Sequence, residues 1–221
     1  MTKTNVYKKW DSLWGSLYQK PIKEDLQDFI LQLAQAGLLG KVIMDLGCGY
    51  NPVTKKLPDK KFKKIYIDVS YGINYNTKNE YNLFVKFDLH NILYENRRDF
   101  KKYMKKLYSF LGNRYNDNKL IKVDTIIYSD VLNYIDYRKV LKNYYIFLNK
   151  GGRKIIFNKI NKGIYELFSD KRPLSNWEIL TFLQKDLRMT IEYVRPHPII
   201  IGDNYEIENA NFIFIAKKIY D

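Results

Sequence analysis

The chain has 221 residues, and its 46% hydrophobic and 16% aromatic content suffices for one α/β domain with a packed core, which argues against wholesale disorder. It has one cysteine, no run of about 18 apolar residues and no apolar N-terminal segment, so we expect a cytoplasmic protein without a disulfide, a membrane contact or a secretory signal. The net charge of +14 suits a polyanionic partner such as RNA, although Lys and Asn are abundant along the whole chain.

Two helices are predicted before the first strand. Aromatic side chains recur every three or four residues between residues 4 and 19, as on one face of a helix. Residues 25–36 form a second amphipathic pattern, which Gly37 ends. The aromatic face has two interpretations, packing against the core or a lid that lines a substrate pocket. Its members are Tyr7, Trp10, Trp14 and Tyr18.

The most informative stretch begins with the apolar run VIM, which reads as a buried strand and continues into DLGCG at residues 45–49. Its two glycines allow a tight turn and a close approach of the backbone to a ligand. Pro52 suits the first turn of a short helix over residues 53–57. Because Asp45 precedes the glycines, this position would repel a pyrophosphate but could accept a hydrogen bond from an amino group.

The next two strands are predicted at residues 63–68 and 84–88, and they end in the acids Asp68 and Asp88. A helix over residues 96–111 follows, with apolar residues on its inner side. Its outer side is either a solvated surface or a contact for nucleic acid. The basic residues on that side are Arg97, Arg98, Lys101, Lys102, Lys105 and Lys106.

A fourth strand is predicted at residues 123–130. Ligands of open α/β sheets lie beyond the carboxyl ends of the strands, so residues 129–134 are the best placed to contact both a cofactor and a substrate. Ser175 and Glu178 predict a capping box at the start of the last helix. The remaining elements are expected at residues 137–148 (helix), 149–152 (turn), 154–157 (strand), 161–174 (loop), 175–186 (helix), and 189–194 and 212–217 (antiparallel strands).

Together, DLGCG and these strands in this order resemble the class I S-adenosylmethionine-dependent methyltransferases over about residues 40–160. The resemblance implies an α/β, Rossmann-like, seven-stranded and mostly parallel sheet with an antiparallel C-terminal strand, flanked by helices. We expect one domain over residues 1–221. Its parts are an N-terminal helical lid over the site (1–39), a cofactor-binding core (40–160) and a C-terminal helix with a strand hairpin (161–221).

The resemblance also implies S-adenosyl-L-methionine as the cofactor. For each acid an alternative remains open: Asp45 could cap the following helix, while Asp68 and Asp88 could be loop acids without a ligand. The residues expected to bind the cofactor are Asp45, Gly47, Cys48 and Gly49 at the methionine part, Asp68 at the ribose, Asp88 and Leu89 at the adenine, and Ser129 and Asp130 beside the sulfonium.

Methyl transfer from a sulfonium is an in-line displacement, for which alignment alone can supply ~7–11 kcal/mol of the barrier. The catalytic residue is therefore unknown, and a base is only weakly indicated. The candidates for a base are Asp130, Tyr134 and His197, and those for acceptor binding are Tyr7, Trp14, Tyr18, Asn133 and Tyr134. No metal site is expected, because two isolated histidines and one cysteine lack the spacing of metal ligands.

Three functions follow from this reading. The first is methylation of a small molecule at O, N or C. The second, favoured by the net charge, is methylation of RNA or a protein, for which the sequence shows no recognition domain. The third is a non-catalytic binding protein with the same fold. The sequence does not indicate the oligomeric state.

Overall fold

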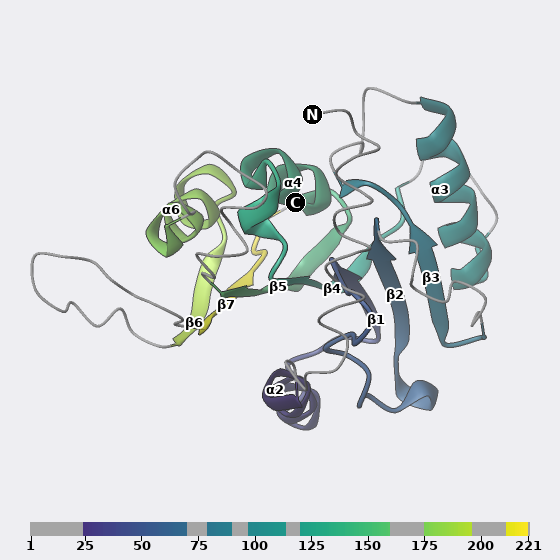
Figure 1. Ribbon diagram of the computed structural model, residues 1–221, viewed down its shortest axis with the longest axis horizontal. Coiled ribbons are helices and arrows are strands. Elements are labelled where there is room, and N and C mark those ends of the chain that lie inside the picture. The colour runs from purple at the N-terminus through teal and green to yellow at the C-terminus, as the bar shows by residue number, and fades with distance from the viewer. Residues whose placement is uncertain are drawn as a thin grey trace, which may run out of the picture.

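The structure is a computed structural model, and it describes residues 24–69, 79–89, 97–113, 120–159, 175–195 and 211–220. Within these ranges the chain forms a seven-stranded sheet with helices on both faces (Figure 1). Several predictions lie outside the described residues, namely the aromatic helix at residues 4–19, the loop at residues 161–174, and the candidate residues Tyr7, Trp14, Tyr18 and His197.

The sheet has the order β3-β2-β1-β4-β5-β7-β6. The first five strands are parallel, while β7 is antiparallel to both β5 and β6. This confirms the predicted mostly parallel sheet and the C-terminal antiparallel pair. The strands are β1 (Val42–Leu46), β2 (Lys63–Asp68), β3 (Asn82–Lys86), β4 (Val123–Ser129), β5 (Leu148–Lys159), β6 (Thr190–Arg195) and β7 (Asn211–Lys217).

Two helical layers cover the sheet, and Figure 1 shows α2 on one side with α3, α4 and α6 on the other. Successive side chains of a strand point to opposite faces, so β1 gives Met44 and Leu46 to the α3–α4–α6 side and Ile43 to the α2 side. Both faces are therefore apolar, as buried parallel strands require. The helices are α2 (Glu24–Gln35), α3 (Arg97–Leu111), α4 (Tyr137–Tyr145) and α6 (Asn176–Thr181), which continues as a π-helical turn (Phe182–Asp186).

Helix α2 agrees with its predicted range to within one residue. Gly37 has a φ of +70°, and the N–H of Leu38 donates to the carbonyl of Leu33 at 2.9 Å. The N–H of Gly37 donates to the carbonyl of Ala34 at 3.2 Å, which completes a Schellman cap. The capping box before α6 is confirmed as well, since the Glu178 carboxylate accepts from the N–H of Ser175 at 3.0 Å.

The short helix predicted at residues 53–57 is wrong. The N–H of Lys55 donates to Pro52 O at 3.2 Å and that of Leu57 to Thr54 O at 3.1 Å, so the segment is a pair of turns that leads into a 3₁₀ helix at Asp59–Lys61. Pro58 has no N–H and restricts the residue before it, and this limits any helix here to a single turn.

Other parts of the chain also differ from the prediction. β3 ends at Lys86, two residues before the predicted end, and α4 ends at Tyr145 instead of residue 148. The predicted turn at residues 149–152 is an irregular part of β5, because the N–H of Gly151 donates to Lys218 O at 2.8 Å and pairs this stretch with the C-terminal segment. Gly151 has a φ of +78°, which a glycine adopts without strain.

Asp124 joins three strands at the amino edge of the sheet. Its Oδ2 accepts from the N–H of Val42 at 3.0 Å, and its Oδ1 accepts from Nδ2 of Asn149 at 2.7 Å. A side chain at Gly40 would place its Cβ 2.0 Å from that of Asp124, so the backbone can approach this carboxylate only as glycine. The starts of β1, β4 and β5 are thereby held at fixed positions.

Two lysines are buried on the α4 side. Lys154 is 0% exposed, and its Nζ donates to the Tyr128 hydroxyl at 3.0 Å and to the carbonyl of Leu141. Lys218 donates to Leu148 O at 3.1 Å. Burial, together with the charge of Lys218, holds the pKa of Lys154 well below its ordinary value. Within the described part of the chain, no carboxylate forms an ion pair with Lys154.

Candidate functional site

The carboxyl ends of β1, β2 and β4 meet at one edge of the sheet. Leu46 at the end of β1 lies in register with Ile67 on β2 and with Tyr128 on β4. The chain runs outward from β1 in one direction to β2 and β3, and then in the other to β4 and β5. Such a reversal opens a crevice between the connections at the carboxyl edge, which is where ligands of open α/β sheets bind.

The glycine loop, residues 47–49, turns sharply at this edge. Gly47 and Gly49 have φ values of +67° and +59°, which residues other than glycine rarely adopt. The N–H of Gly47 donates to Ile67 O at 2.8 Å, and the N–H of Gly49 donates to Oδ2 of Asp68 at 2.9 Å. The prediction of a tight turn is thus confirmed, and Asp68 is the residue that fastens the loop to the end of β2.

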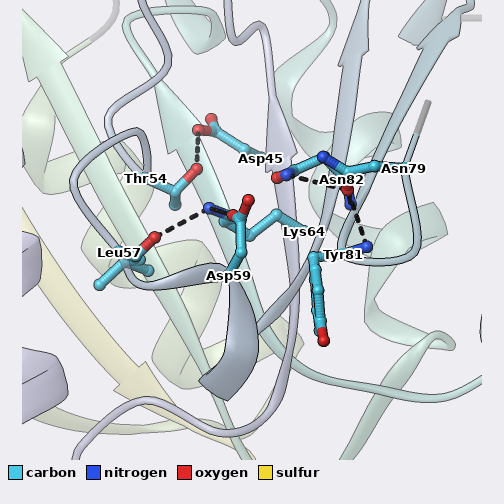
Figure 2. A network of polar contacts seen from close by, with 8 residues as sticks. All are labelled: Asp45, Thr54, Leu57, Asp59, Lys64, Asn79, Tyr81 and Asn82. Carbon is cyan, nitrogen blue, oxygen red and sulfur yellow. Dashed lines mark hydrogen bonds and ion pairs between the residues drawn. The ribbon is translucent and has the colours of Figure 1, made fainter. Parts of the chain in front are cut away.

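Beneath the loop, Asp45 is completely buried. Its Oδ2 accepts from the Thr54 hydroxyl at 3.2 Å, as Figure 2 shows. Tyr66 lies against the same group: burial raises the pKa of its phenol, the hydrogen bond with Thr54 lowers it, and the charge of Asp45 raises it further. No α-helix lies between Asp45 and β2, and the 3₁₀ helix at Asp59–Lys61 begins well after Asp45, so the alternative of a helix cap is wrong. A contact of Asp45 with a ligand stays a prediction.

The segment after the loop is fastened by Lys64, whose role the sequence analysis missed. Lys64 is 3% exposed, and its Nζ donates to Leu57 O at 2.9 Å and lies 2.6 Å from Oδ1 of Asp59 (Figure 2). The hydrogen bond from Lys64 lowers the pKa of the Asp59 carboxyl against the opposing effect of burial. The sequence signal for this role was the presence of a lysine within a predicted buried strand.

Figure 2 also shows Asn79, whose Oδ1 accepts from the N–H of Tyr81 and from the N–H of Asn82 at the start of β3.

The segment after β4, residues 130–134, lies beside the glycine loop. Asp130 has a φ of +54° and donates its N–H to Phe157 O at 2.9 Å. A 3₁₀ helix at Leu132–Tyr134 follows, in which Asn133 is buried and Tyr134 half-buried. Burial first, and then the charge of Asp130, raises the pKa of the Tyr134 phenol. Asp130 and Tyr134 therefore lie close enough to influence each other, while the cofactor and acceptor contacts expected of Ser129, Asp130, Asn133 and Tyr134 stay predictions.

Asp88 and Leu89 follow β3 at the same edge. The N–H of Phe87 donates to the backbone carbonyl of Asp68 at 2.8 Å, which holds this segment next to the end of β2. Asp88 is half-buried, whereas Leu89 is 5% exposed and packs in the core beneath α3. An adenine contact of either residue stays a prediction.

The end of β5 contributes a pair that the sequence analysis did not find. Nδ2 of Asn158 donates to Oδ1 of Asn176 at 2.9 Å, and both side chains are buried. This bond joins the carboxyl end of β5 to the first turn of α6. Nothing in the sequence indicated it, because the two residues approach only when β5 and α6 are both in place.

The basic face of α3 is solvent-exposed. Phe100, Met104 and Leu107 point inward, as predicted. The side chains described on the outer face are those of Arg98, Lys101, Lys102, Lys105 and Lys106. Among the residues that the structure describes, no three His, Cys, Asp or Glu side chains are grouped as metal ligands would be. No helix in these ranges is long and apolar enough to cross a membrane.

This strand order, with a glycine loop after β1 and an acid at the end of β2, is the class I methyltransferase fold. The structure is similar to the N-methyltransferase NodS from Bradyrhizobium japonicum with S-adenosyl-L-homocysteine (13% identity, 97% of this chain and 98% of that chain, TM-score 0.63). It is similar to magnesium protoporphyrin IX methyltransferase from Synechocystis with bound SAM (14%, 98% and 96%, 0.62). A third is 1,6-didemethyltoxoflavin-N1-methyltransferase from Burkholderia thailandensis (13%, 98% and 85%, 0.61).

No family model and no curated protein matches the sequence. At identities of 13–14%, the likeness to these solved structures establishes the fold.

Proposed function

We propose that the protein is a methyltransferase that uses S-adenosyl-L-methionine to methylate a small molecule at O, N or C. The observation that carries the proposal is the hydrogen bond of 2.9 Å from the Gly49 N–H to the Asp68 carboxylate. It fixes a glycine turn and an acid side by side at the reversal point of the sheet. The similar structures that contain SAM or S-adenosyl-L-homocysteine support the choice of cofactor.

The residues at this edge fit that cofactor. A carboxylate has about four lone-pair positions, so Asp68 can accept from the Gly49 N–H and still has acceptor capacity for ribose hydroxyls. Gly49 presents backbone without a side chain at a position expected for the methionine part, and Asp88 lies next along the edge for the adenine. When bound, the cofactor supplies an electrophilic methyl group on a sulfonium whose leaving group is a neutral thioether.

The protein's own contribution is alignment of the acceptor and, where needed, removal of a proton. The raised pKa of Tyr134 keeps its phenol protonated near neutral pH, which favours a role as a hydrogen-bond donor over that of a base. Asp130, which is partly exposed beside Tyr134, is the better candidate for a base. Asn133 and Tyr134 are the described candidates for contact with the acceptor.

A small acceptor is supported by the names of two similar proteins, which specify magnesium protoporphyrin IX and 1,6-didemethyltoxoflavin. A cytoplasmic location is part of the proposal, since the one cysteine, Cys48, is a buried thiol outside any disulfide. Methylation of RNA or a protein is the second candidate, and the exposed basic face of α3 favours it. Nucleic-acid binding that falls steeply with salt would support this alternative.

Calorimetric titration with S-adenosyl-L-methionine and S-adenosyl-L-homocysteine tests the proposal. We expect micromolar binding by the natural chain, and an affinity lower by about tenfold or more in Asp68→Ala, because a hydrogen bond to a charged group is lost. Asp68→Asn distinguishes an effect on the loop from an effect on ligand binding. Its amide oxygen can still accept from the Gly49 N–H, so the loop keeps this hydrogen bond, while the charge that the ligand would meet is lost. Asp28→Ala is the control for charge, because Asp28 is 55% exposed in a surface ion pair with Lys56.

Two outcomes would contradict this. If the natural chain binds neither ligand, the proposed cofactor is wrong. If Asp68→Ala folds normally and binds as tightly as Asp28→Ala, the assignment of Asp68 to the ribose is wrong while the cofactor stands.

A further inference from the structure

The side chain of Val131 occupies the space directly over Gly47. A Cβ added at Gly47 would lie 2.7 Å from Cβ and 2.9 Å from Cγ2 of Val131, distances at which one of the two must move. Gly37, Gly112 and Gly151 have similar φ values, but a Cβ at any of them would meet nothing within 4 Å. Gly47 therefore differs from these three glycines in being in close contact with a second segment of the protein.

Both sides of this contact are fastened to the sheet. On one side, the glycine loop is tied to β2 through the N–H groups of Gly47 and Gly49. On the other, Asp130 donates its N–H to Phe157 O on β5, and the N–H of Tyr134 donates to Val131 O at 3.1 Å. The left-handed backbone of Asp130, rare for residues other than glycine, turns the chain into the segment that begins with Val131.

A displacement of the loop toward Val131 therefore pushes on that side chain, and Val131 is the residue immediately before the 3₁₀ helix that carries Asn133 and Tyr134. The two sets of residues given separate tasks above, cofactor binding and acceptor contact, meet at this one van der Waals contact. Closely packed groups of this kind transmit a shift because the neighbouring atoms have no free space into which to relax.

We propose that Val131 is a positioning residue, through which cofactor binding at the glycine loop orders residues 130–134 before the acceptor enters. The inference rests on the proposed function. If the bound cofactor raises the affinity for the acceptor by a given factor, an acceptor held by residues 130–134 raises the affinity for the cofactor by that same factor, because the coupling between two binding sites is reciprocal. A purely structural valine would instead change the stability of the protein and leave the response of residues 130–134 to the cofactor intact.

Amide hydrogen exchange with and without saturating S-adenosyl-L-homocysteine tests the coupling directly. In the natural chain we expect the ligand to slow exchange in the peptide covering residues 130–137 by about fivefold or more, since a closed segment opens less often. In Val131→Ala the slowing falls below about twofold there, while the glycine loop remains protected. Val140→Ala is the matched control, because Val140 is a fully buried valine on α4 with no part in the contact.

A double-mutant cycle supplies the second measurement. Gly47→Ala lowers the affinity for S-adenosyl-L-homocysteine, and Val131→Gly removes the atoms that the new methyl group would strike. The double variant recovers part of the affinity: it binds at least about threefold more tightly than the two single effects combined would predict. Gly37→Ala carries a similar φ of +70° without a contact and leaves the affinity unchanged.

The outcomes distinguish a failure of the proposed function from a failure of the role of Val131. Absence of ligand binding in the natural chain overturns the proposed function. Binding without protection of residues 130–137, equal protection in Val131→Ala, or strictly additive effects in the cycle overturns the role of Val131 and leaves the cofactor assignment standing.

Discussion

Replacement of the buried Lys154 by methionine should change the pH dependence of stability. Lys154 is 0% exposed, and its burial and the nearby charge of Lys218 lower its pKa in the folded state from the ordinary value of 10.5. Between the lowered pKa and 10.5, the unfolded chain binds a proton that the folded chain does not. The free energy of unfolding of the natural chain therefore rises with pH in this window.

The size of the effect follows from one proton. Within the window between the lowered pKa and 10.5, where the folded-state amine is neutral and the unfolded-state amine is charged, the slope is about 1.4 kcal/mol per pH unit. Methionine has similar length and no charge, so Lys154→Met removes this contribution. It also gives up the hydrogen bonds to Tyr128 and Leu141, a loss of about 1 kcal/mol for each that does not vary over this pH range.

Urea unfolding of both chains across this pH range, followed by circular dichroism, gives the comparison. Titrating groups far from Lys154 are common to the two chains and cancel in the difference, whereas Lys218, whose charge acts on Lys154, does not. Lys122→Met is the matched control, because Lys122 also donates to a backbone carbonyl, that of Ile146 at 2.7 Å, but is exposed. Parallel stability curves for the natural chain and Lys154→Met would refute the reasoning, since they would mean that Lys154 is protonated equally in the folded and unfolded states.

Two more predictions concern Asp124 at the amino edge of the sheet and the exposed face of α3. Asp124→Ala removes the acceptor of the Val42 N–H and of the Asn149 amide, and we expect it to lower the free energy of unfolding by about 2–4 kcal/mol, measured by the same urea titration. Asp124→Asn should cost less because it keeps one acceptor. Lys101→Glu with Lys105→Glu on the exposed face of α3 should leave stability within about 0.5 kcal/mol, and a larger loss would show that this face is packed. If RNA is the acceptor, the same double variant weakens its binding in filter assays between about 50 and about 200 mM salt.

Local signals in the sequence were sufficient for much of the fold. The apolar period of residues 25–36 with Gly37 behind it gave α2, and the apolar runs that end in acids gave the parallel strands. DLGCG at residues 45–49 placed the loop correctly because the positive φ of Gly47 and Gly49 favours glycine, which is a local signal in the sequence.

The failures are of two kinds, one local and the other dependent on partners that are distant in sequence. Residues 53–57 have too few positions before Pro58 for a helix, and Thr54 is instead engaged by Asp45. The turn at residues 149–152 became part of β5 through the backbone of Lys218. The contact of Val131 with Gly47 brings together residues 84 positions apart, which no pattern in one sequence can indicate.

One consequence concerns how opening of the cofactor loop could be followed without altering the protein. Cys48 is the single cysteine of the chain, lies between Gly47 and Gly49, and is 1% exposed against Tyr66. A thiol reagent can therefore reach Cys48 only when the loop moves away from Tyr66, and the rate of alkylation measures how often the loop opens. Cys48 therefore serves as a natural reporter of loop opening, and it lies in the loop that is proposed to bind the cofactor.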